Sequence, residues 1–159
     1  MKATVTWKEG LAFTGLAKSG IPVRLDGDLT QGGQNSGVQP MEMVALGLAG
    51  CTAMDVLSIL QKKRQKITSF EVDIDAPRSA DYPNVFTSAV LTLIVAGRGI
   101  QEDALMRSIE LSITKYCAVN AMLEKAFPIE LRYEIYEDEG KGARRLIHQG
   151  TWRQAVQEE

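Results

Sequence analysis

The feature that most constrains this sequence is a long segment, residues 41–63, in which only Gly47 and Gly50 weaken a helical pattern. Pro40 precedes it, and proline suits the first turn of a helix because its missing N–H would be unpaired there anyway. Residues 43–53 carry no charge and are apolar or small on every side, which predicts a helix that is buried all round. This apolar run is shorter than the roughly 20 residues that a membrane-spanning helix needs. We therefore expect a central helix, with small residues that allow another element to approach closely.

The rest of the chain predicts short strands and two further helices. Alternating polar and apolar residues indicate strands, and glycine-rich stretches such as residues 27–39 indicate loops. The expected strands are 3–8, 11–16, 21–26, 70–75, 85–96 and 129–135, and the expected helices are 101–115 and 121–126. Because the strands and helices do not alternate regularly, the fold class is α+β. We expect one domain over residues 1–136 and a polar tail over residues 137–159, with a marginal strand near residues 145–148.

Composition excludes several classes of function. The net charge of −2 leaves no basic surface for nucleic acid or an anionic membrane, so we expect neither partner. The first residues alternate without an apolar core, which predicts no secretion signal and a cytoplasmic location. The one histidine, His148, lies far from both cysteines, so we predict no metal site, and no motif indicates a bound cofactor.

Cys51 and Cys117 are the only cysteines. A reducing cytoplasm argues against a permanent disulfide. Free cysteine is nevertheless among the most buried residue types, so from the residues alone each could be an inert packing residue or a reactive thiol.

The segments around both cysteines resemble a known family. Residues 39–56, Gln-Pro-Met-Glu-Met-Val-Ala-Leu-Gly-Leu-Ala-Gly-Cys-Thr-Ala-Met-Asp-Val, resemble the first cysteine helix of the OsmC/Ohr family. Residues 115–119, Lys-Tyr-Cys-Ala-Val, with the Met-Leu-Glu-Lys of residues 122–125, resemble its second cysteine segment. The Pro-Met-Glu-Met-Val of residues 40–44 looks most like the YhfA-like branch. The resemblance covers residues 1–136.

This resemblance implies a fold and an activity. The fold would be OsmC-like, with antiparallel sheets wrapped around long central helices in an intertwined homodimer. The activity would be that of a thiol-dependent peroxidase that reduces organic hydroperoxides or hydrogen peroxide in oxidative stress defence. Cys51 would be the peroxidatic thiol and Cys117 the resolving thiol, and an external dithiol, of dihydrolipoyl type, would be the reductant.

The family's activating residues match this sequence incompletely. The better-known peroxidases of the family hold an arginine with a glutamate that directly follows the proline, where this chain has Met41. Glu42, Arg24 and Lys18 are the candidate supporting residues, and Glu42 also suits a cap at the helix start. Two alternatives therefore stay open: a non-catalytic ligand-binding or redox-sensing member of the fold, and a structural dimer with two inert cysteines.

Overall fold

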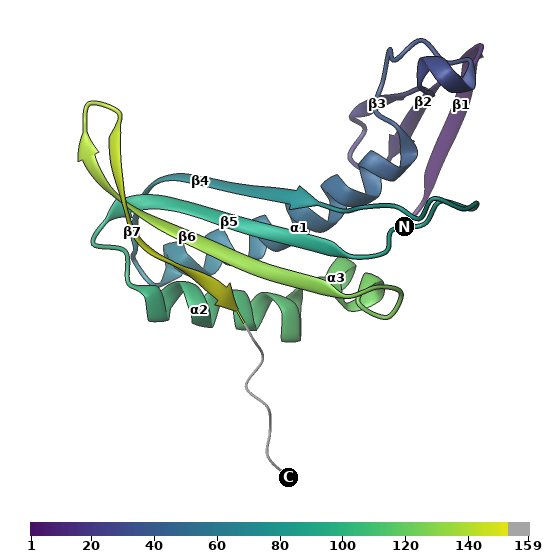
Figure 1. The fold of residues 1–159 in the computed structure, drawn as a ribbon. Coiled ribbons are helices and arrows are strands. Elements are labelled where there is room, and N and C mark those ends of the chain that lie inside the picture. Colours follow the sequence, from purple (N-terminus) through teal and green to yellow (C-terminus); the bar gives the residue numbers. More distant parts are fainter. Residues whose placement is uncertain (153–159) are drawn as a thin grey trace. The chain divides into compact units, whose positions relative to one another are not determined.

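A computed structural model describes residues 1–152 of the chain and contains two β-sheets and a long helix (Figure 1). The predicted α+β class is confirmed. Residues 1–46 and the residues from Gly47 onward form two compact units, and each is described by itself.

The first unit is a three-stranded antiparallel sheet. Its strands follow one another as β1 (Ala3–Glu9), β2 (Ala12–Ala17) and β3 (Pro22–Leu25). Gly10 has φ of +50° in the turn between β1 and β2, a conformation that glycine adopts at little cost. These strands agree with the predicted ones to within one or two residues.

The glycine-rich loop after β3 is organised by a buried carboxylate. Asp26 accepts hydrogen bonds from the backbone N–H groups of Gly27, Gln34 and Ser36, and from the Ser36 hydroxyl at 2.6 Å. These bonds, the Ser36 hydroxyl first among them, lower the pKa of Asp26 to about 2. The loop, which includes the short helix η1 (Leu29–Gln31), is therefore fixed by one side chain.

Helix α1 (Pro40–Lys62) begins and ends within one residue of the predicted helix. Only one stripe of it is buried in the chain: Leu48, Ala49, Thr52, Val56 and Leu60. The expectation that it is buried all round is wrong for a single chain, because the Leu46 and Met54 side chains are 56% and 75% exposed. The glycines also do not serve close packing here, since a Cβ added at either would meet no atom of another element among residues 1–152 within 4 Å.

The second unit contains a four-stranded sheet. Its order is β4 (Lys66–Asp75), β5 (Ala89–Arg98), β6 (Ile129–Gly140) and β7 (Ala143–Trp152). The expectation of antiparallel sheets is wrong for one pair, because β5 and β6 are parallel. Helices α2 (Glu102–Leu111) and α3 (Ala118–Leu123) connect these two strands and return the chain to the end of the sheet at which β5 starts.

One face of this sheet carries the core. Leu93 and Val95 on β5 and Ile135 on β6 are fully buried and pack in one cluster with Val56 of α1 and Leu105 of α2. Both helices thus cover the same face of the sheet. By length and composition alone α1 could span a membrane, a test that core helices of globular proteins also pass. Its packing on the sheet gives it the role of a core helix.

The segment predicted as a polar tail continues the sheet. The domain boundary that we expected at residue 136 falls within β6, and the marginal strand expected at residues 145–148 is the middle of β7. Ile147 and Trp152 of β7 pack against the core cluster. Residues 153–159 of the predicted tail lie outside the described residues.

Candidate functional site

Cys51 and Cys117 lie close together although they belong to different elements. Cys51 is on α1 and half-buried, whereas Cys117 precedes α3 and is 2% exposed. Both are free thiols. The two sulfurs and a carboxylate oxygen of Asp55 all lie within 4.8 Å of one another. The second unit therefore contains a compact cluster of two thiols and one carboxylate.

A widened helical turn places Cys117. The backbone N–H of Cys117 donates to the carbonyl of Ser112, five residues earlier, at 2.7 Å, which closes the π-helix η2 (Ser112–Tyr116). The helix ends there, because Cys117 adopts an extended backbone with ψ of 95°. Its sulfur then accepts a hydrogen bond from the backbone N–H of Asn120 at 3.4 Å. Single π-helical turns of this kind are frequent at functional sites.

Two buried hydroxyl groups complete the surroundings of the cluster. Thr52 Oγ1 lies 3.6 Å from Cys117 Sγ, a hydrogen bond that either group can donate. Ser112 Oγ donates to Asp55 Oδ2 at 3.3 Å. Thr52 and Ser112 are both fully buried, so these contacts hold Cys117 and Asp55 in fixed positions.

The two cysteines differ in their surroundings. Burial raises the pKa of the Cys117 thiol, and the neighbouring Cys51 thiol adds to this, against smaller opposing effects of the Asn120 N–H and Thr52. The surroundings of Cys117 thus favour its neutral thiol form. Cys51, which is more accessible, is the cysteine that a solute reaches more readily.

Comparison with known proteins identifies the family. The family model described as OsmC-like protein matches residues 33–132. The chain belongs to the OsmC-like family. This confirms the family predicted from the two cysteine segments.

Relatives of this OsmC-like protein support that assignment. Protein YhfA of Escherichia coli strain K12 is 44% identical over 138 residues, which cover 85% of this chain and 98% of the relative. A solved structure from structural genomics is 40% identical with a TM-score of 0.78, covering 87% of this chain and 100% of that one. An organic hydroperoxide resistance protein OsmC from Legionella pneumophila shares the fold at 12% identity and a TM-score of 0.62, covering 84% and 94% of the chains.

The three candidate supporting residues all belong to the first unit of this OsmC-like protein. Glu42 accepts a hydrogen bond from the backbone N–H of Gln39 at 2.8 Å, as a cap of the start of α1 does. Lys18 is exposed in the turn between β2 and β3.

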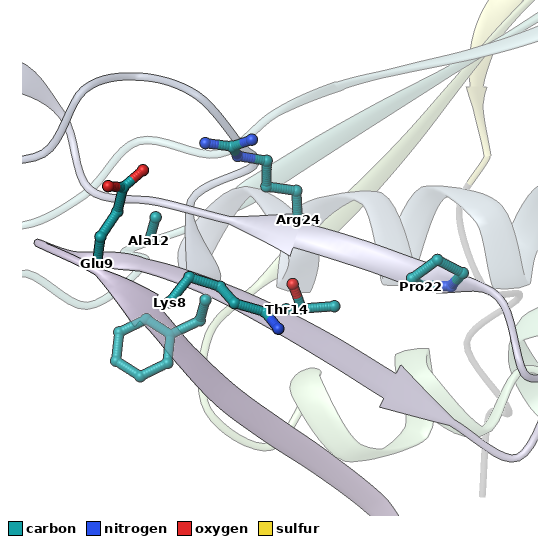
Figure 2. A pocket seen from close by; sticks show the side chains of 7 residues that line it. Lys8, Glu9, Ala12, Thr14, Pro22 and Arg24 are labelled. Atoms are coloured by element: carbon teal, nitrogen blue, oxygen red, sulfur yellow. The ribbon is translucent and has the colours of Figure 1, made fainter.

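Arg24 has local partners in the same unit. Its Nε donates to Ser36 Oγ at 3.1 Å, and it lines a pocket of about 270 Å³ with Lys8 and Glu9 of β1 (Figure 2). Within residues 47–152, no hydrogen bond or ion pair joins a lysine or arginine to either cysteine or to Asp55.

Sequence reasoning missed Asp55, Thr52 and Ser112. Asp55 had a usable signal, since it follows Cys51 by four residues and such residues share one face of a helix. Thr52 and Ser112 had none, because their contacts depend on where the second helical segment crosses α1.

Proposed function

We propose that this OsmC-like protein is a thiol-dependent peroxidase that reduces organic hydroperoxides or hydrogen peroxide in oxidative stress defence. The observation that carries the proposal is the adjacency of two free thiols, one half-exposed and one buried, at the end of a π-helical turn. Cys51 is the attacking thiol and Cys117 the resolving thiol. The fold shared with a hydroperoxide resistance protein supports the same class of activity.

The reaction balances with two thiols and one peroxide. The Cys51 thiolate attacks the O–O bond, an alcohol or water leaves, and Cys51 becomes a sulfenic acid. The Cys117 thiol displaces water from this sulfenic acid and a disulfide forms. Its sulfur lies within 4.8 Å of Cys51 Sγ, so side-chain rotation suffices to bring the two atoms to bonding distance. An external dithiol, of dihydrolipoyl type, then reduces the disulfide by exchange.

Attack by Cys51 on a peroxide would be assisted by a cation beside its sulfur. Arg24 and Lys18 are the candidates, with Glu42 holding the start of α1. Arg24 is the better of the two because the pocket that it lines also contains an acid, Glu9, whereas the pocket lined by Lys18 contains none.

The proposed assembly is a cytoplasmic homodimer. Leu46, Met54, Tyr116 and Met122 are each at least half exposed in the single chain. All four lie within five residues of a cysteine in the sequence. A group of exposed apolar side chains near a functional site is typical of an interface between protein chains.

Stopped-flow oxidation of the reduced protein tests the proposal. We expect rapid loss of the Cys51 thiol, a Cys51–Cys117 disulfide, and repeated turnover with a dihydrolipoyl donor. Cys51→Ser should abolish the fast phase. Cys117→Ser, the matched variant, should keep the first oxidation but lose the disulfide. A wild-type rate no faster than that of free cysteine would refute the proposal.

A second candidate is a redox sensor without turnover. It is favoured by the carboxylate beside the thiols and by Met41, which replaces the glutamate of the better-known peroxidases. This candidate predicts one slow oxidation per chain and no recycling by any dithiol. Sustained peroxide consumption would exclude it.

A further inference from the structure

The second unit brings three metal-binding side chains to one point. Cys51 and Asp55 lie one turn apart on the same face of α1, and Cys117 is brought beside them from the end of η2. Their donor atoms lie within 4.8 Å of one another. In a tetrahedral zinc site, with metal–sulfur bonds of about 2.3 Å, neighbouring sulfurs are about 3.8 Å apart. Small side-chain rotations would therefore bring all three donors to bonding distance of one ion.

Hydrogen bonds around these donors resemble those that support metal ligands. Ser112 Oγ donates to one oxygen of Asp55, which fixes the carboxylate and leaves its other oxygen available. The Asn120 N–H donates to the sulfur of Cys117, and such bonds stabilise a thiolate ligand. Asn120 and Ser112 are themselves buried, so the supporting groups are held in place before any ion arrives.

We propose that the reduced protein binds one divalent cation of the zinc class through Cys51 Sγ, Cys117 Sγ and the Asp55 carboxylate. Two thiolates select Zn²⁺, Co²⁺ or similar ions over Mg²⁺ and Ca²⁺, which prefer oxygen ligands. Cys51 and Asp55 are only partly buried, which leaves an approach for the ion and a fourth position for water. No metal site was predicted from the sequence, because two cysteines and the remote His148 are too few ligands without a carboxylate. Asp55 supplies the missing third ligand.

Metal binding would also regulate oxidation of the two thiols. This regulatory role, unlike metal binding itself, rests on the proposed peroxidase function. A bound ion occupies both thiolates and so slows their oxidation. When peroxide does oxidise the metal-bound pair, two thiolates, one peroxide and two protons yield a disulfide, an alcohol or water, and a further water. The disulfide no longer offers two thiolates, so the ion is released.

Titration of the reduced, full-length protein with Co²⁺ without oxygen tests the site itself. We expect one Co²⁺ per chain, with a thiolate-to-cobalt charge-transfer band, visible bands typical of tetrahedral geometry, and displacement of both by Zn²⁺. Asp55→Asn should weaken binding at least tenfold. Cys51→Ser and Cys117→Ser should each remove most of the charge-transfer band. Asp73→Asn, an exposed acid on β4, is the matched control and should bind as the wild type does.

A second readout does not depend on spectra of the variants. Zn²⁺ should protect Cys51 of the wild type from alkylation, and protection should need more Zn²⁺ in Asp55→Asn. Absence of the charge-transfer band in the reduced wild type, or equal Co²⁺ affinity of wild type and Asp55→Asn, would overturn the proposed site. Both measurements omit peroxide, so they test the metal site independently of the stopped-flow experiment. Tight Co²⁺ binding by a protein whose metal-free form shows no peroxidase activity would refute the proposed function but support the metal site.

Discussion

At the scale of single residues, Cys117 shows how a buried sulfur is controlled. Its burial favours the neutral thiol, whereas the Asn120 N–H and the Thr52 hydroxyl favour the thiolate. Resolution of a sulfenic acid requires a nucleophilic sulfur, so these two hydrogen bonds act on the step that forms the disulfide. Thr52 is the one of the two that a side-chain substitution can remove.

Thr52→Val should slow disulfide formation at neutral pH about two- to tenfold, the range that one hydrogen bond of ordinary strength gives. Because loss of the hydroxyl raises the pKa of Cys117 further, the pH profile of disulfide formation should shift to higher pH. Single-turnover oxidation across a pH series measures both effects. Thr92→Val on β5 is the matched control. An unshifted profile in Thr52→Val would show that the Thr52 contact has no chemical role.

The residues of the site were predictable to different degrees. Cys51 and Cys117 stand in sequence segments specific enough to identify the family, and their roles remain predictions that the experiments above test. Helical spacing places Asp55 beside Cys51, but the approach of Cys117 to both depends on where the π-helical turn ends, which apolar periodicity does not reveal. Pairs from distant segments depend on packing, which a single sequence encodes only indirectly.

At the scale of elements, the loop between β3 and α1 depends on the ionised Asp26. Its pKa is about 2 in the folded protein, below the ordinary value of 3.8, so folding favours the carboxylate. This contribution to stability is complete above about pH 4 and is lost as the pH falls toward 2. Thermal unfolding between pH 2 and 7 should show a smaller pH dependence for Asp26→Asn than for the wild type.

Asp26→Asn should also lower the melting temperature at pH 7, because the amide presents one acceptor oxygen to four donors. Glu71→Gln, an exposed acid on β4, controls for the loss of one negative charge. If the melting temperatures of wild type and Asp26→Asn changed with pH in parallel, the Asp26 carboxylate would not be what stabilises the loop.

The strand β7 tests whether the carboxyl-terminal segment is structural. A Cβ at Gly150 would lie 2.7 Å from the hydroxyl of Tyr133, which is held by a hydrogen bond to Glu102. Gly150→Val should therefore destabilise the protein by about 1–3 kcal/mol through overpacking. Chemical denaturation measures this, with Gln149→Val, an exposed residue of the same strand, as the control. Equal stabilities of the two variants would mean that β7 does not pack as described.

The elements differ in how far the sequence predicted them. Helix α1 and the first three strands were predicted closely because their apolar patterns and turn residues are local signals. The strand β7 was underestimated because its residues are mostly polar, and its place depends on pairing with β6. The parallel pairing of β5 and β6 could not be predicted from alternation, which is the same in either direction.

At the scale of the whole molecule, the unexpected exposure on α1 is the informative departure from prediction. A helix that is apolar all round is expected to be covered, and in the single chain only one stripe of it is. The proposed homodimer accounts for both facts, since a second chain would cover what the first leaves exposed. The small residues near Cys51 would then serve packing between chains instead of within one chain.

Met54 is the residue at which this explanation is most directly tested. It is 75% exposed on α1 and lies three residues after Cys51, so in the proposed dimer its thioether is buried beside the reactive thiol. Met54→Glu would bury an unpaired carboxylate in the dimer interface. Burying an unpaired charge costs more free energy than the surrounding apolar contacts supply, so the dimer should be destabilised. Light scattering should show a dimer for the wild type and a concentration-dependent shift to monomer for Met54→Glu. Leu146→Glu, a charge at a partly exposed leucine on β7, should stay dimeric. A monomeric wild type, or a dimer unaffected by Met54→Glu, would contradict the assignment of this face to the interface.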